Sequence, residues 1–119
     1  MDSTGRPLRA FITQGQQHES TVAEELIDYI HANACIADGG YDANRIVEAL
    51  KQRNIEAVIP PNPTRKTKRR YNKRLYSIRY LVECFFHNIK RFRRIATRYD
   101  KTLACYNGFL QLACALQWL

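Results

Sequence analysis

Three prolines within four residues divide the chain into two parts. Pro60, Pro61 and Pro63 surround Asn62, and proline neither donates a backbone hydrogen bond to a sheet nor continues a helix. Before this break, short apolar runs alternate with amphipathic segments; after it comes a dense basic run. We therefore predict one domain over residues 1–119, with an α/β part over 1–60, a basic loop over 61–74 and two helices over 75–119.

The α/β part has the element order β-α-β-α-β. The apolar and amphipathic patterns predict, in order, a strand over 7–14, a helix over 21–34, a strand over 34–37, a helix over 43–54 and a strand over 55–59. Ser20 or Thr21 is expected to cap the first helix and Asp42 the second, which Asn54 would end. Since helical crossovers join them, the last two strands should pair in parallel.

The part after the break is predicted to be helical from Leu75 to about Arg94 and again from about Thr102 to Leu119. On the first helix one face is apolar and can pack on a core, with Ile78, Val82, Phe85, Ile89 and Phe92. The second helix is almost entirely apolar, but it is short and contains Asn107 and Gln111, which favours a packing helix over a membrane span.

The charge is concentrated in one region. Residues 1–64 hold five basic and nine acidic side chains, whereas residues 65–98 hold thirteen basic side chains and one acid, Glu83. Such a field favours a polyanionic partner, and the aromatic side chains within the run favour nucleic acid. A solvated linker with a basic helix face, or an acidic membrane surface, are the alternatives.

Cysteine and histidine give little sign of metal chemistry. The four cysteines, Cys35, Cys84, Cys105 and Cys114, form no C-x-x-C pair. This spacing excludes a disulfide scaffold and a zinc ribbon, fits a reducing cytosol, and favours small core residues. The three histidines are dispersed, and we expect none of them to bind a metal.

One polar stripe gathers several functional groups on the first helix after the break. Tyr76, Arg79, Glu83 and Lys90 fall within about 60° of one another on a helical wheel. Glu83 is either a divalent-metal ligand or the partner of Arg79 in an i,i+4 ion pair. Asp38 is the second candidate carboxylate, because it ends a predicted strand where open α/β sheets bind ligands; it could equally be a turn or capping residue.

The segments over 37–50 and 55–102 resemble DDE transposases of bacterial insertion sequences. The Y-(2)-R-(3)-E-(6)-K signature of the insertion-sequence four and five groups is matched by Tyr76, Arg79, Glu83 and Lys90. The flanking segments LVECFF and FRRIATRYDK are similar to the five group. The resemblance covers the chain from Pro7 onward and identifies it as the C-terminal part of a catalytic domain.

The resemblance implies an RNase H-like, retroviral-integrase-like α/β fold in which three carboxylates hold Mg²⁺ or Mn²⁺ ions that promote attack on a DNA phosphodiester. Asp38 would be the second acid and Glu83 the third, both as catalytic residues and metal ligands. Tyr76, Arg79, Lys90 and the basic-loop residues Lys68, Arg69 and Arg70 would contact DNA. Gly39 stands where many relatives have a basic residue.

The resemblance also implies that the first two strands of the catalytic domain are missing. The first catalytic Asp of such enzymes lies on an earlier strand, and Asp2 resembles instead the acid that ends the second strand. We therefore expect a partial fold lacking two strands, which normally separate residues 7–14 from 34–37, followed by two C-terminal helices. Such a chain is either a decayed fragment or the downstream frame of a frameshifted element, and it should be inactive alone.

Two functions remain open from the sequence. The first is DNA cleavage and strand transfer in transposition, in the bacterial cytoplasm at the nucleoid. Its partners would be the insertion-sequence ends, target DNA, the upstream part of the same transposase and other copies of the chain. The second is a non-catalytic basic DNA-binding protein, as an inhibitor of the full transposase or a decayed remnant. Neither function involves a membrane.

Overall fold

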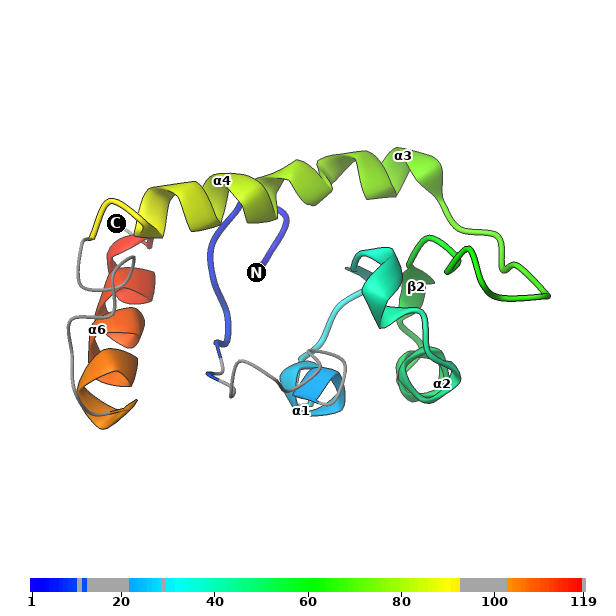
Figure 1. The fold of residues 1–119 in the computed structure, drawn as a ribbon, viewed down its shortest axis with the longest axis horizontal. Coiled ribbons are helices and arrows are strands. Elements are labelled where there is room, and N and C mark those ends of the chain that lie inside the picture. The colour runs from blue at the N-terminus through cyan, green and yellow to red at the C-terminus, as the bar shows by residue number, and fades with distance from the viewer. Residues whose placement is uncertain (11, 13–21, 29, 93–102, 119) are drawn as a thin grey trace. The chain divides into compact units, whose positions relative to one another are not determined.

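The computed structural model describes residues 1–10, 12, 22–28, 30–92 and 103–118. The chain forms two compact units. One unit comprises Thr13–Arg79, and the other comprises Met1–Ile12 together with Tyr80–Leu119. Each unit has its own cluster of buried apolar side chains. The described residues therefore form a mixed α/β chain with a small sheet and several helices (Figure 1).

A two-stranded parallel sheet lies in the first unit. Strand β1 (Ala34–Ile36) pairs with strand β2 (Glu56–Val58), with Cys35 opposite Ala57. The ladder continues beyond both strands, because the amide of Glu56 donates to the carbonyl of Asn33 and the amide of Ala37 donates to the carbonyl of Val58. The parallel pairing predicted for these two strands is confirmed.

Helices α1 (Ala23–Ile27) and α2 (Asn44–Gln52) contact each other, and α2 also contacts β2. Figure 1 shows both helices end-on, on the same side of β2. Their core consists of apolar side chains from both helices and the strand region: Ala23, Ile46, Leu50, Ile55 and Ile59. Asn54 takes a left-handed conformation with φ of 57°, and the next amide returns to the carbonyl of Leu50, so α2 ends where predicted.

Helix α1 is shorter than the helix predicted over 21–34. Asp28 has extended backbone, and the guanidinium of Arg53 donates to the carbonyl of Ile27 and to the Asp28 carboxylate. This side chain satisfies an end carbonyl that a longer helix would have bonded internally. The predicted caps Ser20 and Thr21 lie outside the described residues.

The loop after β2 leads into helix α3 (Lys73–Tyr76), which contacts β2 and continues as the 3₁₀ helix η3 (Ser77–Arg79). Asn72 caps α3, because its side chain accepts a hydrogen bond from the amide of Leu75. Three residues of 3₁₀ geometry therefore interrupt the single α-helix predicted from Leu75 to Arg94.

The second unit contains helices α4 (Tyr80–Ile89) and α6 (Leu103–Leu116) and the N-terminal residues. Phe85 and Ile89 pack with Ala113 and Cys114 in its core. Two of the positions predicted to face a core are thus buried. The last helix was expected to be a packing helix, but Leu112 and Leu116 of α6, and Trp118 beyond its end, are exposed.

The N-terminal residues form a turn rather than the predicted strand. No strand occurs at Pro7–Ala10 or at Ile12, the described part of the predicted strand over 7–14. The carbonyl of Pro7 accepts a hydrogen bond from Trp118 Nε1 at 2.9 Å, and Arg6 lies over the Trp118 ring. The Pro7 carbonyl is therefore bonded to a side chain, whereas in a strand it would bond to the backbone of a neighbouring strand. Pro7 also has no amide hydrogen to donate to such a strand.

Candidate functional site

Asp38 lies just beyond the carboxyl end of β1, as predicted. Its Oδ1 accepts a hydrogen bond from the amide of Gly40 at 3.0 Å, capping the 3₁₀ helix η2 (Gly39–Tyr41). Its Oδ2 lies 3.3 Å from Nη2 of Arg79. The Asp38 side chain is 43% exposed and that of Arg79 is 30% exposed. The structure therefore brings together two predicted site residues that lie 41 positions apart, and the carboxylate is both oriented and open to solvent.

Tyr76 lies at the end of α3, three residues before Arg79. Its ring packs edge-on against that of Tyr71, with ring centroids 5.6 Å apart. Because Tyr71 belongs to the basic loop, this contact joins the loop to the helix that carries Arg79.

Glu83 and Lys90 lie in the second unit, at exposed positions within and directly after α4. A 3₁₀ turn advances about 120° per residue, against about 100° for an α-helix, so the wheel that placed them on one stripe with Tyr76 does not hold across η3. The sharing of a site by Asp38 and Glu83 stays a prediction.

The described residues do not complete a metal site. Across residues 1–10, 12, 22–28, 30–92 and 103–118, no three His, Cys, Asp or Glu side chains form a group able to hold a metal ion. The Asp38 carboxylate instead contacts a cation, the guanidinium of Arg79.

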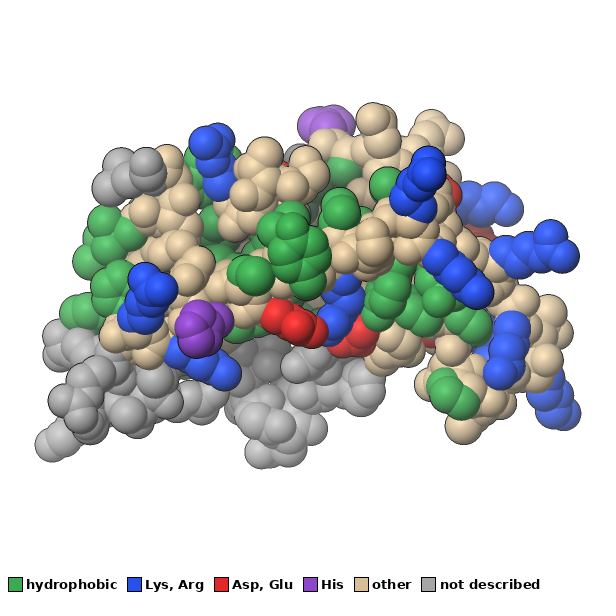
Figure 2. All heavy atoms as spheres, turned by 90° about the horizontal axis from the view of Figure 1, so that it is seen from above, with side chains coloured by type: hydrophobic (Ala, Val, Ile, Leu, Met, Phe, Trp, Pro, Cys, Tyr) green, Lys and Arg blue, Asp and Glu red, His purple; other side chains and the backbone are tan. Residues whose placement is uncertain are grey.

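The basic loop contains both exposed and engaged cations. Lys68 and Arg70 are exposed, and Figure 2 shows basic side chains projecting at the edge where Figure 1 places this loop. Arg69 is different, since its Nη2 lies 2.6 Å from Oδ1 of Asp42. DNA contact by any of the three stays a prediction.

Asp42 does not cap α2, so that prediction was wrong. Ala43 occupies the cap position, and no side chain caps α2 there. The Asp42 carboxylate faces the basic loop instead and is 1% exposed, bonded to Arg65 and Arg69. These partners lie 23 and 27 residues away along the chain, so local spacing could not reveal the contacts. The sequence gives no other sign that Arg65 bonds to Asp42.

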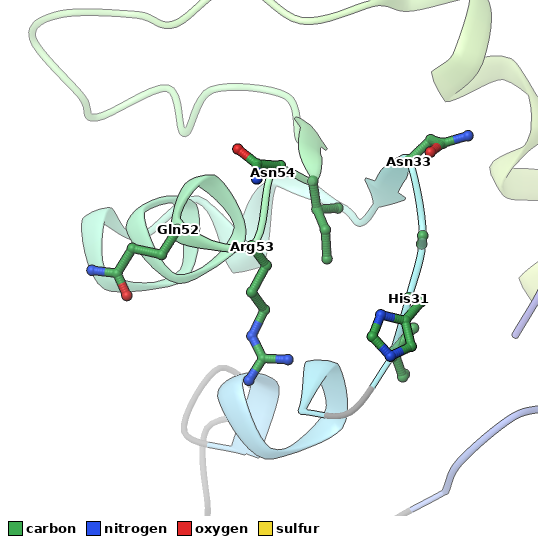
Figure 3. Close-up of a pocket in the computed structure, with 8 residues that line it drawn as sticks. His31, Asn33, Gln52, Arg53 and Asn54 are labelled. Atoms are coloured by element: carbon green, nitrogen blue, oxygen red, sulfur yellow. The ribbon is translucent and has the colours of Figure 1, made fainter.

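A pocket among the described residues lies away from these groups. Its volume is about 690 Å³, and its lining includes His31, Asn33, Arg53 and Asn54 (Figure 3). Asn33 precedes β1 and Asn54 precedes β2, so this pocket lies at the amino ends of the strands. Parallel sheets bind ligands at the opposite end, where Asp38 lies.

Asp2 organises the N-terminal turn. Its Oδ1 accepts hydrogen bonds from the amide and hydroxyl of Thr4 and from the amide of Arg6. These bonds, that of the Thr4 hydroxyl first, hold the pKa of Asp2 below its usual value of 3.8. This network gives Asp2 a structural role in the N-terminal turn, and its exclusion as the first catalytic acid stays a prediction.

The cysteines divide by burial. Cys114 is buried and Cys35 packs against the first core, and desolvation raises the pKa of both thiols. Cys84 and Cys105 are exposed, so the prediction of core positions was wrong for these two.

Comparisons with known proteins indicate the family of the chain. The profile of the family described as "Transposase DDE domain" matches residues 1–118. A Brucella ovis protein named "Putative transposase for insertion sequence element IS6501" is 40% identical over 122 residues, covering 100% of this chain and 93% of that protein.

A Burkholderia cepacia protein named "Putative transposase for insertion sequence element IS402" is 30% identical over 127 residues, covering 97% of this chain and 58% of its own length. The chain therefore spans little more than half of that relative. No solved structure gives a significant match. None of the described helices has the length and hydropathy needed to cross a membrane.

Proposed function

The chain belongs to the transposase DDE domain family of bacterial insertion sequences, whose function is DNA transposition, and we propose that Asp38 is one of its catalytic acids. The observation that supports this most is the position of Asp38 at the carboxyl end of β1. There the Gly40 amide and Arg79 fix both carboxylate oxygens. A carboxylate held in this way at a sheet edge suits work on a bound phosphodiester.

We propose that the fold is part of an RNase H-like domain, with β1 and β2 as two adjacent strands of its sheet. Their parallel pairing supports this. In this frame Glu83 is the second acid that this chain contributes. DDE transposases use divalent metal ions, which activate the attacking oxygen and stabilise the leaving one. Asp38 and Glu83 would provide two of the three carboxylates that hold such ions.

The DNA surface proposed here consists of five residues: Lys68, Arg70, Tyr76, Arg79 and Lys90. The high positive charge of residues 65–98 supports it, because phosphate contacts by Lys and Arg dominate the affinity for duplex DNA. In this proposal Arg79 both orients Asp38 and contacts DNA, since its guanidinium contacts the Asp38 carboxylate and its side chain is still 30% exposed. The DNA would be insertion-sequence ends and target DNA in the bacterial nucleoid.

A second candidate function is a non-catalytic DNA-binding protein that competes with a complete transposase for its DNA. The observation that supports it is the concentration of basic side chains in residues 65–98, because DNA binding needs this charge whether or not the protein is catalytic. Both candidates require the same DNA surface, so DNA binding tests their common basis.

The test measures affinity for duplex DNA by fluorescence anisotropy at several salt concentrations. Lys90→Ala and the double variant Lys68→Ala/Arg70→Ala should weaken binding, and the salt slope should shrink by about one for each phosphate that is no longer neutralised. Lys51→Ala is the matched control, because Lys51 is an exposed lysine on α2 outside the proposed surface. Salt slopes that are the same in all four proteins would contradict the proposed surface.

A further inference from the structure

Asp42 is the most enclosed charged side chain among the ion pairs of the first unit. Its carboxylate is 1% exposed. Oδ2 accepts hydrogen bonds from the amide of Asn62 at 2.7 Å and from Nε of Arg65 at 2.9 Å, and Oδ1 accepts one from Nη2 of Arg69 at 2.6 Å. All three donors belong to the loop that follows β2, so a single carboxylate ties this loop to the turn after β1.

Arg65 is held at more than one point. Its Nη2 donates to the carbonyl of Asp42 at 3.2 Å, and its Nη1 donates to Oδ1 of Asn44 at 3.0 Å. The preceding turn is also bonded locally, because the Asn62 side chain accepts from the amide and hydroxyl of Thr64. The loop is therefore folded onto the first unit by side-chain bonds rather than by strand or helix pairing.

The five cations of residues 65–70 separate into an inner and an outer set. Arg65 and Arg69 face Asp42, with side chains 22% and 31% exposed. Lys66, Lys68 and Arg70 are exposed. Five like charges within six residues repel one another. The carboxylate offsets the charge of the inner set and thereby favours one loop conformation that presents the outer set to solvent.

We infer that Asp42 is a positioning residue for DNA binding: it holds the loop so that Lys66, Lys68 and Arg70 form a surface that contacts the phosphate backbone. Arg65 and Arg69 fix the loop instead of contacting DNA. This inference rests on the proposed function for its ligand. Asp38 and Asp42 flank the same 3₁₀ turn, η2, so the turn that orients the candidate catalytic carboxylate also anchors the phosphate-binding loop.

The positioning role of Asp42 predicts a change in DNA affinity opposite to the change that net charge alone predicts. Removal of an acid from a basic protein ordinarily strengthens its binding to DNA. If Asp42 positions the loop, Asp42→Asn should weaken binding although it raises the net positive charge, because an unordered loop must lose conformational entropy when it binds. Asp28→Asn is the matched control: it removes the same charge from an ion pair with Arg53 that lies outside the loop.

The experiment uses the full chain and has two readouts, anisotropy with a duplex and the initial rate of trypsin cleavage within residues 62–70, identified by mass spectrometry. Asp42→Asn should raise the cleavage rate about tenfold and weaken DNA binding several-fold, since local opening exposes the loop to protease. Asp28→Asn should leave the loop cleavage rate unchanged and bind DNA equally or more tightly. Circular dichroism checks that both variants keep the helical content of the wild type.

A neighbouring pair of variants tests the two sets without touching Asp42. Arg69→Gln and Arg70→Gln remove the same charge from adjacent residues, one inward and one outward. Arg70→Gln should reduce the salt slope by about one and leave cleavage at the other loop sites unchanged. Arg69→Gln should accelerate cleavage and leave the slope nearly unchanged. This pair decides the question even if Asp42→Asn fails to fold.

The other possible results contradict the positioning role, the division of the cations into two sets, or the proposed function. Unchanged loop cleavage in Asp42→Asn and Arg69→Gln overturns the positioning role, and so does faster cleavage combined with tighter DNA binding. Equal changes in salt slope for Arg69→Gln and Arg70→Gln overturn the division into two sets. Absence of DNA binding by the wild type overturns the proposed function and the outer surface, whereas the cleavage rates still report whether Asp42 orders the loop.

Discussion

Two carboxylates four residues apart have opposite environments at the residue scale. Asp38 is 43% exposed and contacts one arginine, whereas Asp42 is 1% exposed and contacts two. The turn η2 between them contains Gly39 and Gly40, which differ in the space around them. A Cβ on Gly40 would lie 3.0 Å from Oδ1 of Asp38, and a Cβ on Gly39 would lie 3.5 Å from the carbonyl of Pro60. Only the first distance is too short for an ordinary contact.

Gly40→Ala should displace the Asp38 carboxylate and weaken its bond to the amide of residue 40. We expect faster amide hydrogen exchange at residue 40 and a loss of about 1 kcal/mol in the free energy of unfolding, the usual value of such a cap. Gly39→Ala is the matched control and should leave this amide unaffected. NMR-detected exchange measures both, and equal acceleration in the two variants would show that the glycine contact does not orient Asp38.

The lowered pKa of Asp2 leads to a prediction on pH. Because the folded pKa lies below the unfolded value of 3.8, this carboxyl stabilises the N-terminal turn above that value, and the contribution is lost as the pH falls through the folded pKa. Thr4→Ala removes the main donor, so the pKa of Asp2 should rise toward 3.8. Carbon-detected NMR titration measures it, with Thr64→Ala as control; an unchanged pKa in Thr4→Ala would assign the shift elsewhere.

At the scale of elements, the sequence was informative where the determinants are local. The apolar runs around Cys35 and Ala57 predicted both strands, and the amphipathic pattern with Asn54 predicted α2 and its end. Predictions failed where a distant side chain decides. Arg53 donates to the last carbonyl of α1, Trp118 donates to the Pro7 carbonyl, and Arg65 donates to the Asp42 carboxylate.

The candidate site shows the same division. Asp38 was predicted from its position after a strand, and the structure adds its contact with Arg79. The periodicity that joined Tyr76 to Glu83 assumed an uninterrupted α-helix, and residues 77–79 instead adopt 3₁₀ geometry. Helical periodicity locates a face only within one regular element.

The packing of α2 is the energetic centre of the first unit, so Leu50→Ala should destabilise that unit strongly. Leu50 is fully buried, and such truncations cost about 2–5 kcal/mol in the free energy of unfolding. Leu112→Ala removes the same atoms from a side chain that is 57% exposed and should cost less than about 0.5 kcal/mol. Urea denaturation followed by circular dichroism compares them, and similar losses would show that α2 does not carry this core.

At the scale of the whole molecule, charge and carboxylates are unevenly distributed. The part before the proline break is net acidic, and the part after it carries most of the cations. The two candidate acids, Asp38 and Glu83, belong to different compact units. Catalysis as proposed needs both carboxylates, whereas DNA binding needs neither, so we expect catalysis to be lost more easily than DNA binding.

The last prediction follows from this dependence. Two-metal phosphoryl transfer needs carboxylates that hold two ions about 4 Å apart, and Asp38 and Glu83 would provide only two of the three acids proposed for this site. The 119-residue chain, given Mg²⁺ or Mn²⁺ and DNA with the element's ends, should therefore show no specific cleavage. Fusion to an upstream segment that carries the first acid of the family should give metal-dependent cleavage.

In the fused protein, Glu83→Gln should abolish cleavage and leave DNA binding equal or tighter, because it removes a proposed metal ligand and one negative charge. Glu48→Gln, an exposed glutamate on α2, makes the same charge change and should retain cleavage. Gel-based cleavage and anisotropy assays measure the two activities separately. Specific cleavage by the unfused chain that Glu83→Gln abolishes would show that the chain already holds all its acids, and the assignment of Asp2 to the N-terminal turn would then be the first to revise.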